Sequence, residues 1–376
     1  MDVSIKMVDL HGQYLKIKDE IDQAIQEVIA SSAFINGKPV EAFARELADY
    51  LGAKYVVPCG NGTDALQIAF QALGLKPGDE VIMPAFNYVA SAEAAALLGL
   101  KPVFVDVWED TFNINENLIR ERIAPATKAI VVVHLFGQSV NMEPILEIAS
   151  QSGLKVIEDN AQSLGSAYSF SDGATKLTGT MGDISTYSFF PTKNLGCFGD
   201  GGALSTNDQD LAQKAAMISR HGQGQKYSYD RIGCNTRLDT IQAAILRVKL
   251  RNLNSYLQSR IEAGHVYNQL LKGVTQVMVP LVNHQSKHTY NQYVIRIKER
   301  DKIKELLKTA GVPSMIYYPS PLHLQKAYAY LGYKAGDLPV SEKLCFEVLA
   351  LPIHTEITSR EQEVVVSALI KSINSL

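Results

Sequence analysis

One lysine in this sequence stands between aromatic residues and a glycine-rich run, in the segment SFFPTKNLGCFGDGGA at 188–203. This residue, Lys193, follows a predicted strand at 183–190 that Pro191 ends. A lysine held in an apolar, partly desolvated setting has a lowered pKa and can attack carbonyl carbons as a nucleophile. A solvated loop lysine is the commoner alternative for such a position when it is considered alone.

A second candidate is the turn CGNGTD at 59–64, which connects a predicted strand at 54–59 to a predicted helix at 61–74. Free backbone amides at the start of a helix, together with the hydroxyl of Thr63, would bind a phosphate. The alternative is an ordinary helix start, with Asn61 or Thr63 as the N-cap and glycines in the turn. The spacing fits neither a Walker A loop nor GxGxxG.

Two adjacent carboxylates end the apolar segment LKVIEDN at 154–160. Because side chains alternate along a strand, we expect Glu158 and Asp159 on opposite faces, with one of them facing a pocket. A helix cap is the alternative role for Asp159. Tyr88 follows a predicted strand at 79–86, where it would stack on a planar ring unless it is an ordinary core or rim aromatic.

A phosphate cradle, a ring platform, a buried acid and an activated lysine are together the parts that pyridoxal phosphate needs. The lysine carries the cofactor aldehyde as a Schiff base, and the acid keeps the pyridine nitrogen protonated so that the ring accepts electrons. The helix start takes the phosphate. The four stretches therefore predict a pyridoxal phosphate site.

Composition sets limits on the class of protein. The chain has 376 residues, a net charge of -3, 46% hydrophobic and 20% charged residues, typical of a globular protein that binds neither nucleic acid nor an anionic membrane. No apolar run has the length of a transmembrane helix, and MDVSIKMVDL lacks the pattern of a signal peptide. The four cysteines form no CxxC pair, so we expect no disulfide, no metal site and a cytoplasmic location.

Strand and helix patterns alternate along the first 207 residues. Predicted strands lie at 54–59, 79–86, 101–107, 128–137, 154–160, 183–190 and 201–207, and predicted helices at 39–51, 61–74, 91–99 and 142–153. This order predicts an α/β fold with a mainly parallel sheet, helices on both faces and a ligand site at the carboxyl ends of the strands.

The pattern changes after residue 239. A long helix is predicted at 239–271, and then a strand at 290–298, a helix at 302–311, a strand at 312–319 and a helix at 360–373. We therefore expect a large cofactor-binding domain at 1–250 and a smaller C-terminal α/β domain at 251–376.

Six motifs together resemble one family. They are FINGKPVEAFARELADYLGAKYVVPCGNGTDAL, EDNAQSLGS, SFFPTKNLGCFGDGGA, HGQ, GCNTRLDTIQAAIL and YYPSPLH. They are similar to the DegT/DnrJ/EryC1/StrS group, fold-type I aminotransferases that use pyridoxal phosphate to aminate nucleotide-linked keto sugars. The resemblance covers nearly the whole chain. It implies L-glutamate as amino donor and a homodimer with shared active sites.

The resemblance implies a role for each matching residue. Lys193 matches the lysine that carries the cofactor, Asp159 the acid on the pyridine nitrogen, and Gln162 the contact to the ring hydroxyl. The remaining cofactor contacts would be the stacking Tyr88, a phosphate cradle of Gly62, Thr63, Asp64 and Ser188, and Asn235 from the neighbouring subunit. Lysine at position 193, where some relatives carry histidine, favours transamination over removal of a sugar hydroxyl.

The flanks of Lys193 indicate the substrate. SFFPTKNLG followed by GDGG is typical of relatives that aminate carbon 3, and it is most similar to enzymes acting on UDP-2-acetamido-2-deoxy-3-oxo-glucuronate for lipopolysaccharide and O-antigen biosynthesis. In those enzymes the arginine matching Arg237 faces an acidic substrate group; a structural salt bridge is the alternative. Tyr317 and Tyr318 replace a His-Tyr pair in a substrate-side loop. His323 would compensate for that histidine, or serve only packing.

Other functions remain open at this point. Within the family, a dTDP-3-oxo-6-deoxyhexose 3-aminotransferase is the main alternative, and a 4-oxo sugar aminotransferase is the next. A nicotinamide-dependent enzyme of the same fold class lacks support, because there is no GxGxxG with an acid about 20 residues later. A cofactor-binding regulator without activity is a third possibility, against which the set Lys193, Asp159 and Gln162 argues.

Overall fold

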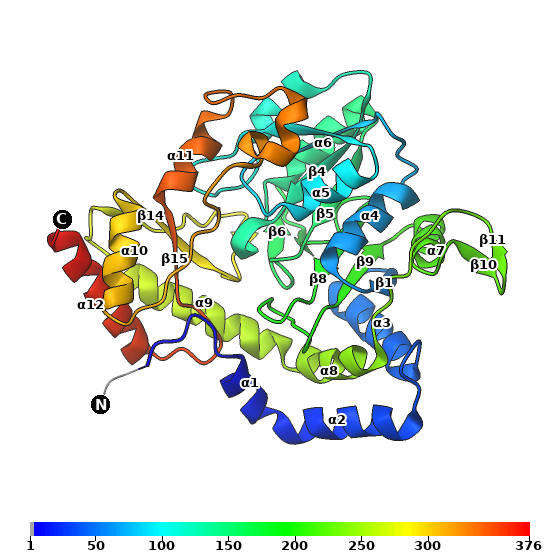
Figure 1. Ribbon diagram of the computed structural model, residues 1–376, viewed down its shortest axis with the longest axis horizontal. Coiled ribbons are helices and arrows are strands. Elements are labelled where there is room, and N and C mark those ends of the chain that lie inside the picture. The colour runs from blue at the N-terminus through cyan, green and yellow to red at the C-terminus, as the bar shows by residue number, and fades with distance from the viewer. Residues whose placement is uncertain (1–3) are drawn as a thin grey trace.

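The computed structural model describes residues 4–376 and is built around a seven-stranded sheet in the order β1-β9-β8-β5-β4-β2-β3 (Figure 1). The strands are β1 (Tyr55–Cys59), β2 (Glu80–Pro84), β3 (Lys101–Val105), β4 (Thr127–Val133), β5 (Lys155–Asp159), β8 (Ile184–Ser188) and β9 (Gly202–Thr206). Strands β3, β2, β4, β5 and β8 pair in parallel, and β9 runs antiparallel between β8 and β1. The predicted mainly parallel sheet is confirmed.

Helices cover both faces of this sheet because its strands are apolar on both sides. In β4, Ala129, Val131 and Val133 pack in one cluster, while Ile130 and Val132 pack in another. The first face is covered by α4 (Gly62–Ala72), α5 (Ala90–Leu97) and α7 (Gln209–Ile218), and the second by α3 (Lys38–Leu51), α6 (Met142–Ser152) and α8 (Thr240–Arg251). Continuous apolar strands are expected in a sheet that is buried on both faces.

The pairing register gathers several strand ends at one edge. Gly202, the first residue of β9, pairs with Cys59 at the end of β1 and with Ser188 at the end of β8. A Cβ atom at Gly202 would lie 2.4 Å from the carbonyl carbon of Asn61, so only glycine allows this approach. The carboxyl ends of the parallel strands therefore lie next to the start of α4.

A smaller unit follows α9 (Leu253–Leu270). Strands β12 (Val277–Met278), β14 (Tyr293–Ile297) and β15 (Val348–Leu351) form an antiparallel sheet, accompanied by α10 (Arg300–Thr309), α11 (Pro339–Glu347) and α12 (Ser359–Asn374). Side chains of α9, α10 and α12 pack with β14 and β15 in one apolar cluster. A single C-terminal α/β unit of this kind matches the predicted fold class.

Two predictions for this half of the chain need correction. The helix predicted at 239–271 is divided at Asn252 into α8 and α9. The domain boundary near residue 250 stays a prediction; that residue lies in the last turn of α8. The strand predicted at 312–319 is wrong, because only Met315 bridges to Ala350. Pro313 and Pro319 have no N–H to donate to a strand ladder.

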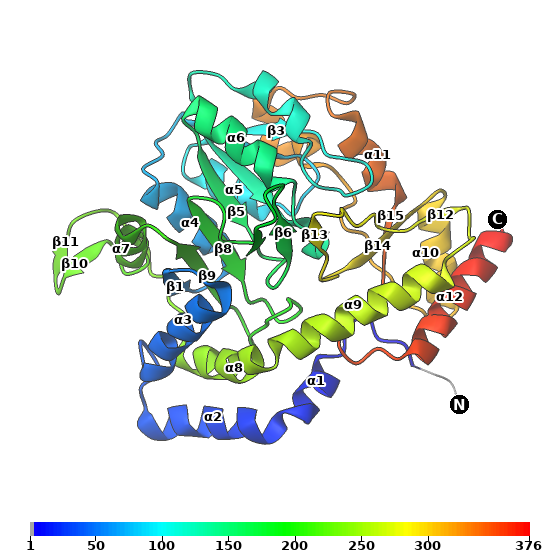
Figure 2. The same cartoon turned by 180° about the vertical axis from the view of Figure 1, so that it is seen from behind.

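The other elements lie around these two units. They are α1 (Leu10–Lys16), α2 (Lys18–Ser31), the hairpin β10 (Gln223–Gln225) with β11 (Ser228–Tyr229), a small sheet of β13 (Ser286–Lys287), β6 (Ala167–Ser169) and β7 (Thr175–Leu177), and 3-10 turns at Glu116–Leu118, Arg120–Arg122, Leu135–Gly137, Leu322–Leu324 and Lys326–Leu331. In Figures 1 and 2 the hairpin projects away from the body, and α2 runs beside α8.

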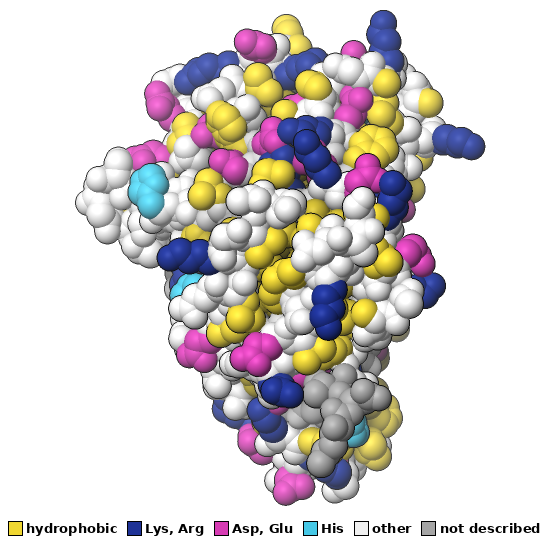
Figure 3. All heavy atoms as spheres, turned by 90° about the vertical axis from the view of Figure 1, so that its left-hand side faces the viewer, with side chains coloured by type: hydrophobic (Ala, Val, Ile, Leu, Met, Phe, Trp, Pro, Cys, Tyr) yellow, Lys and Arg dark blue, Asp and Glu magenta, His cyan; other side chains and the backbone are white. Residues whose placement is uncertain are grey.

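The surface is of mixed charge where it is viewed from the side of α10 and α12. Basic and acidic side chains are interspersed on this face (Figure 3). Within residues 4–376, no helix combines the length and the apolar character needed to cross a membrane.

Candidate active site

Lys193 lies in a tight turn directly after β8. Its backbone N–H donates to the carbonyl of Phe190 at 2.9 Å, and the N–H of Cys197 donates to the carbonyl of Phe189 at 2.7 Å, which closes the turn. Burial lowers the pKa of the Lys193 amine to about 8, although the charge of Asp159 opposes this shift. A solvated loop lysine would keep its ordinary pKa, so the structure favours the nucleophile over that alternative.

A second buried lysine lies behind the same turn. Lys249 of α8 is 3% exposed, and its ammonium donates to the carbonyl of Gly196 at 2.7 Å. Burial also lowers the pKa of Lys249 to about 8. Because its donor is directed at the backbone of the turn, Lys249 supports the segment that carries Lys193.

Asp159 ends β5 on the side of Lys193. It is 6% exposed and accepts hydrogen bonds from the Ser91 hydroxyl at 2.9 Å and the Ala161 N–H at 3.2 Å. Burial raises the pKa of Asp159, and these two donors, together with the charge of Lys193, oppose the rise. A buried carboxylate beside an amine of lowered pKa is the combination that the sequence predicts for the cofactor ring.

Glu158 faces away from this pair, as strand alternation predicts. Its carboxylate accepts from the backbone N–H groups of Gly179, Met181 and Gly182 at 2.6 to 2.7 Å and contacts Nε2 of His134 at 2.9 Å. Burial alone would raise its pKa, but the bonds from His134 and the backbone hold it below the ordinary value. Glu158 is thus the structural carboxylate of the two.

Gln162 and an aromatic cluster lie next to Asp159. Gln162 Oε1 accepts from the N–H of Phe136 at 2.8 Å, and its Nε2 donates to the Tyr318 hydroxyl at 3.0 Å. The rings of Tyr88 and Tyr318 lie 6.0 Å apart, and Tyr88 is 56% exposed. Burial raises the pKa of Tyr318, so its hydroxyl stays protonated. Tyr318, predicted as a substrate contact, therefore lies among the residues predicted for the cofactor ring.

The start of α4 offers two free amides to an anion. Asn61 is the N-cap, and its side chain accepts from the N–H of Asp64 at 2.8 Å. The N–H groups of Gly62 and Thr63 have no partner within residues 4–376. A Cβ atom at Gly62 would lie 2.7 Å from Cβ of Ser188, so the cradle and the end of β8 are in direct contact. Of the three residues whose amides are predicted to bind the phosphate, Asp64 uses its N–H in the helix cap. The N–H groups of Gly62 and Thr63 remain available to the phosphate.

The donor set fits pyridoxal phosphate. Two helix-start amides and the Ser188 hydroxyl suit the phosphate, while Asp159, Gln162 and Lys193 suit the ring nitrogen, ring hydroxyl and aldehyde. Thr186 lies on the same face of β8 as Ser188, and its buried hydroxyl has no hydrogen-bond partner in the described part of the chain. An unpaired buried hydroxyl on this face is consistent with a polar ligand there.

Asn235, Arg237 and His323 are further predicted site residues. Asn235 is exposed, and neighbouring Thr236 accepts from the N–H of Gly60 at 2.8 Å, which holds Arg237 beside the cradle. Arg237 forms no ion pair within residues 4–376, which argues against the salt-bridge alternative. His323 is 1% exposed and contacts Glu342 at 3.1 Å, a position that favours its packing role over substrate contact.

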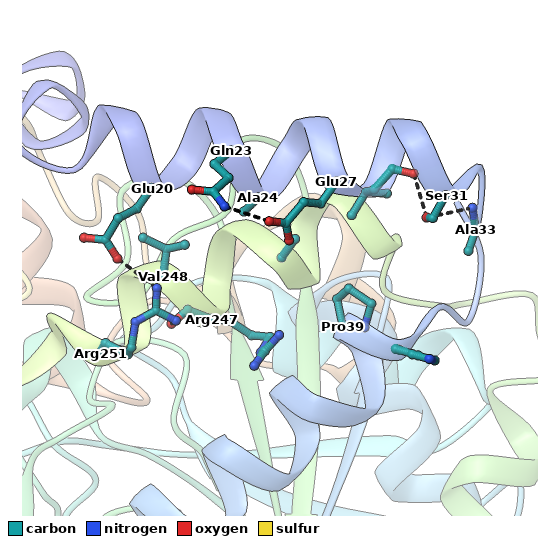
Figure 4. Close-up of a pocket in the computed structure, with 13 residues that line it drawn as sticks. Glu20, Gln23, Ala24, Glu27, Ser31, Ala33, Pro39, Arg247, Val248 and Arg251 are labelled. Atoms are coloured by element: carbon teal, nitrogen blue, oxygen red, sulfur yellow. Dashed lines mark hydrogen bonds and ion pairs between the residues drawn. The ribbon is translucent and has the colours of Figure 1, made fainter.

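A cavity of about 560 Å³ between α2 and α8 is separate from these residues (Figure 4). Its rim is charged, but Arg251 pairs with Glu20 at 2.9 Å and Arg247 pairs with Glu46 at 2.6 Å. None of the predicted site residues lines it.

Sequence reasoning did not identify Ser91 and Thr186. Thr186 precedes Ser188 by two positions on the same strand, and this spacing was the available signal. Ser91 had no comparable signal, because its contact with Asp159 joins residues 68 positions apart.

Comparison with known proteins identifies the family. The model of the DegT/DnrJ/EryC1/StrS aminotransferase family matches residues 15–370. The chain belongs to this family. The family is one of pyridoxal phosphate-dependent sugar transaminases, so the predicted enzyme class and cofactor are confirmed.

Three curated relatives are similar over nearly their whole length. The chain is 44% identical over 369 residues to the pleiotropic regulatory protein of Geobacillus stearothermophilus, covering 98% of each chain. It is 43% identical over 365 residues to UDP-2-acetamido-2-deoxy-3-oxo-D-glucuronate aminotransferase of Pseudomonas aeruginosa, covering 97% and 99%. It is 40% identical over 365 residues to dTDP-3-amino-3,6-dideoxy-alpha-D-galactopyranose transaminase of Aneurinibacillus thermoaerophilus, covering 97% and 98%.

Solved structures agree with the fold and the cofactor. DesV of S. venezuelae superposes with a TM-score of 0.95 at 35% identity, covering 98% of both chains. NtdA of Bacillus subtilis, solved with bound PMP, superposes with a TM-score of 0.89 at 32% identity, covering 100% of this chain and 86% of NtdA. This DegT-family chain therefore has the same architecture as an enzyme that was solved with PMP bound.

The lowered pKa of Lys193 can be measured in the cofactor-free protein. Trace acetylation, resolved by peptide mass spectrometry, should rise with a midpoint near pH 8 at Lys193. Lys101 is an internal control whose pKa is shifted in the opposite direction, because its hydrogen bond to Glu80 raises that pKa. Asp159→Asn should move the Lys193 midpoint lower still, since the Asp159 charge raises that pKa. A Lys193 midpoint at or above that of Lys101 would contradict the assignment.

Proposed function

We propose that this aminotransferase moves an amino group from L-glutamate to carbon 3 of a nucleotide-linked 3-oxo sugar, UDP-2-acetamido-2-deoxy-3-oxo-D-glucuronate, in the biosynthesis of bacterial surface polysaccharide such as O-antigen. The observation that carries the reaction type is the placement of Lys193 and Asp159 at one sheet edge, with the pKa of Lys193 lowered to about 8. The carbon 3 assignment rests on the motif SFFPTKNLG with GDGG and on the 43% identical relative from Pseudomonas aeruginosa.

Each residue has a distinct task in this proposal. When bound, pyridoxal phosphate supplies an aldehyde and an electron-accepting ring. Lys193 binds the aldehyde and, because its pKa is near 8, can accept and return a proton during transfer. Asp159 holds a proton on the ring nitrogen, and Gln162 orients the ring hydroxyl. Gly62, Thr63 and Ser188 bind the phosphate, and Tyr88 packs against the ring.

Arg237 supports an acidic substrate. It lies beside the cradle and forms no ion pair in the described part of the chain, so its guanidinium is available to a carboxylate. A dTDP-3-oxo-6-deoxyhexose is the alternative substrate, favoured by the 40% identical relative from Aneurinibacillus thermoaerophilus. A regulatory role is suggested by the name of the 44% identical Geobacillus relative, and it would not require Lys193, Asp159 and Gln162 together.

We also propose a homodimer in which each subunit completes its partner's site. Asn235 lies on the exposed connection between the projecting hairpin β10–β11 and α8. Large apolar side chains on and beside this hairpin are exposed, with Tyr227 at 77% and Ile232 at 90%. Exposed apolar side chains on a projecting hairpin favour burial against a second subunit.

A substrate panel tests the proposed reaction. With glutamate as donor, the protein should aminate the 3-oxo uronate in preference to 3-oxo-6-deoxy and 4-oxo nucleotide sugars, and Lys193→Ala should abolish turnover. Arg237→Met should raise the KM for the uronate by about tenfold, as expected for loss of a charged hydrogen bond, and leave the 6-deoxy sugar unaffected. Preference for a 4-oxo sugar would contradict the carbon 3 assignment.

Mixed dimers test the sharing of sites. Lys193→Ala and Asn235→Asp should each be inactive at limiting cofactor, the second because it places a carboxylate against the phosphate. If Asn235 acts across the interface, co-refolded heterodimers contain one intact site, and the mixture should regain about a quarter of wild-type activity. No recovery, in a mixture shown by mass spectrometry to contain heterodimers, would place Asn235 in its own subunit's site.

A further inference from the structure

We propose that Ser91 is a positioning residue that holds the Asp159 carboxylate in its charged form and directs it at the cofactor ring nitrogen. This inference rests on the proposed role of Asp159. Ser91 lies in the first turn of α5, is 0% exposed, and donates its hydroxyl proton to Asp159 Oδ2 at 2.9 Å. Nothing else in the site contacts that oxygen at hydrogen-bond distance within residues 4–376.

Asn87 determines the direction of this hydrogen bond. Nδ2 of Asn87, which is 4% exposed, donates to the Ser91 oxygen at 3.3 Å. An amide nitrogen can only donate, so the serine oxygen accepts there and its single proton is left for Asp159. The chain Asn87–Ser91–Asp159 thus also ties the residue next to Tyr88 to the acid.

The surroundings of Asp159 make this donor important. The carboxylate is buried, which favours its neutral form. The charged group facing it is Lys193, and the charge of His134 also opposes the rise in the pKa of Asp159. His134 accepts the Val140 N–H at Nδ1 and contacts Glu158 through Nε2, so both of its ring nitrogens have partners other than Asp159. Besides the charges of Lys193 and His134, stabilisation of the Asp159 charge comes from Ser91, the Ala161 N–H and the start of α5.

The sequence provides a matched control for a purely structural serine. Ser185 is 1% exposed and donates to Glu158 Oε1 at 3.3 Å, so it is a buried serine bonded to the neighbouring carboxylate. Glu158 faces away from Lys193 and accepts three backbone N–H groups as well. Loss of the Ser185 hydroxyl should therefore affect packing but not the ring nitrogen.

Binding of two cofactors to the cofactor-free protein separates these roles. Pyridoxal phosphate has the ring nitrogen, and 1-deazapyridoxal phosphate has carbon in its place. Ser91→Ala should raise the Kd of pyridoxal phosphate about tenfold, the usual effect of losing a hydrogen bond to a charged group, and change the Kd of the deaza analogue less than about twofold. Ser91→Cys, which keeps the shape with a weaker donor, should be intermediate for pyridoxal phosphate. Ser185→Ala should not discriminate between the two.

The outcomes separate this inference from the proposed function. If Asp159→Asn does not discriminate between the two cofactors, the role of Asp159 is wrong and the inference fails with it. If Asp159→Asn discriminates but Ser91→Ala and Ser91→Cys weaken both cofactors equally, or match Ser185→Ala, the Ser91 role alone is overturned. Thermal unfolding of each cofactor-free variant shows whether it is folded, and Ser91→Cys supplies the comparison should Ser91→Ala be unfolded.

Discussion

Burial opposes both charges of the Asp159–Lys193 pair, and the site depends on how the fold holds these two groups together. Burial raises the pKa of Asp159 and lowers that of Lys193 to about 8, while each charge moderates the shift of the other. An acid and an amine arranged in this way are poised for proton transfer near neutral pH. They stay in place because neighbouring groups, above all Ser91 and the closed turn at 189–197, hold them.

The sheet register brings these groups to one place. Asp159 pairs with Thr186 across β5 and β8, and Gly202 fits between the ends of β8 and β1. This arrangement puts the acid, the lysine turn and the start of α4 at the carboxyl edge of the parallel strands, where sheets of this class bind ligands. A side chain at Gly62 would clash with Ser188, so the contact between cradle and strand end requires glycine.

Much of this arrangement follows from local sequence patterns. All seven strands of the main sheet lie within or next to predicted segments, because strands buried on both faces are continuously apolar. The opposite orientation of Glu158 and Asp159 follows from strand alternation. Tertiary packing decided the rest. Tyr318 joins the aromatic cluster at Gln162, and His323 is buried against Glu342, neither of which has a local signal.

The central claim is that Lys193, and not another amine, anchors the cofactor. Lys249 is the natural competitor, because it is also buried with a pKa lowered to about 8 and lies behind the same turn. Borohydride reduction of the protein loaded with pyridoxal phosphate, followed by peptide mapping, distinguishes the two lysines directly. The account predicts a stable cofactor label confined to the peptide that contains Lys193. A label on the Lys249 peptide, or no stable label on a protein that has bound the cofactor, would contradict it.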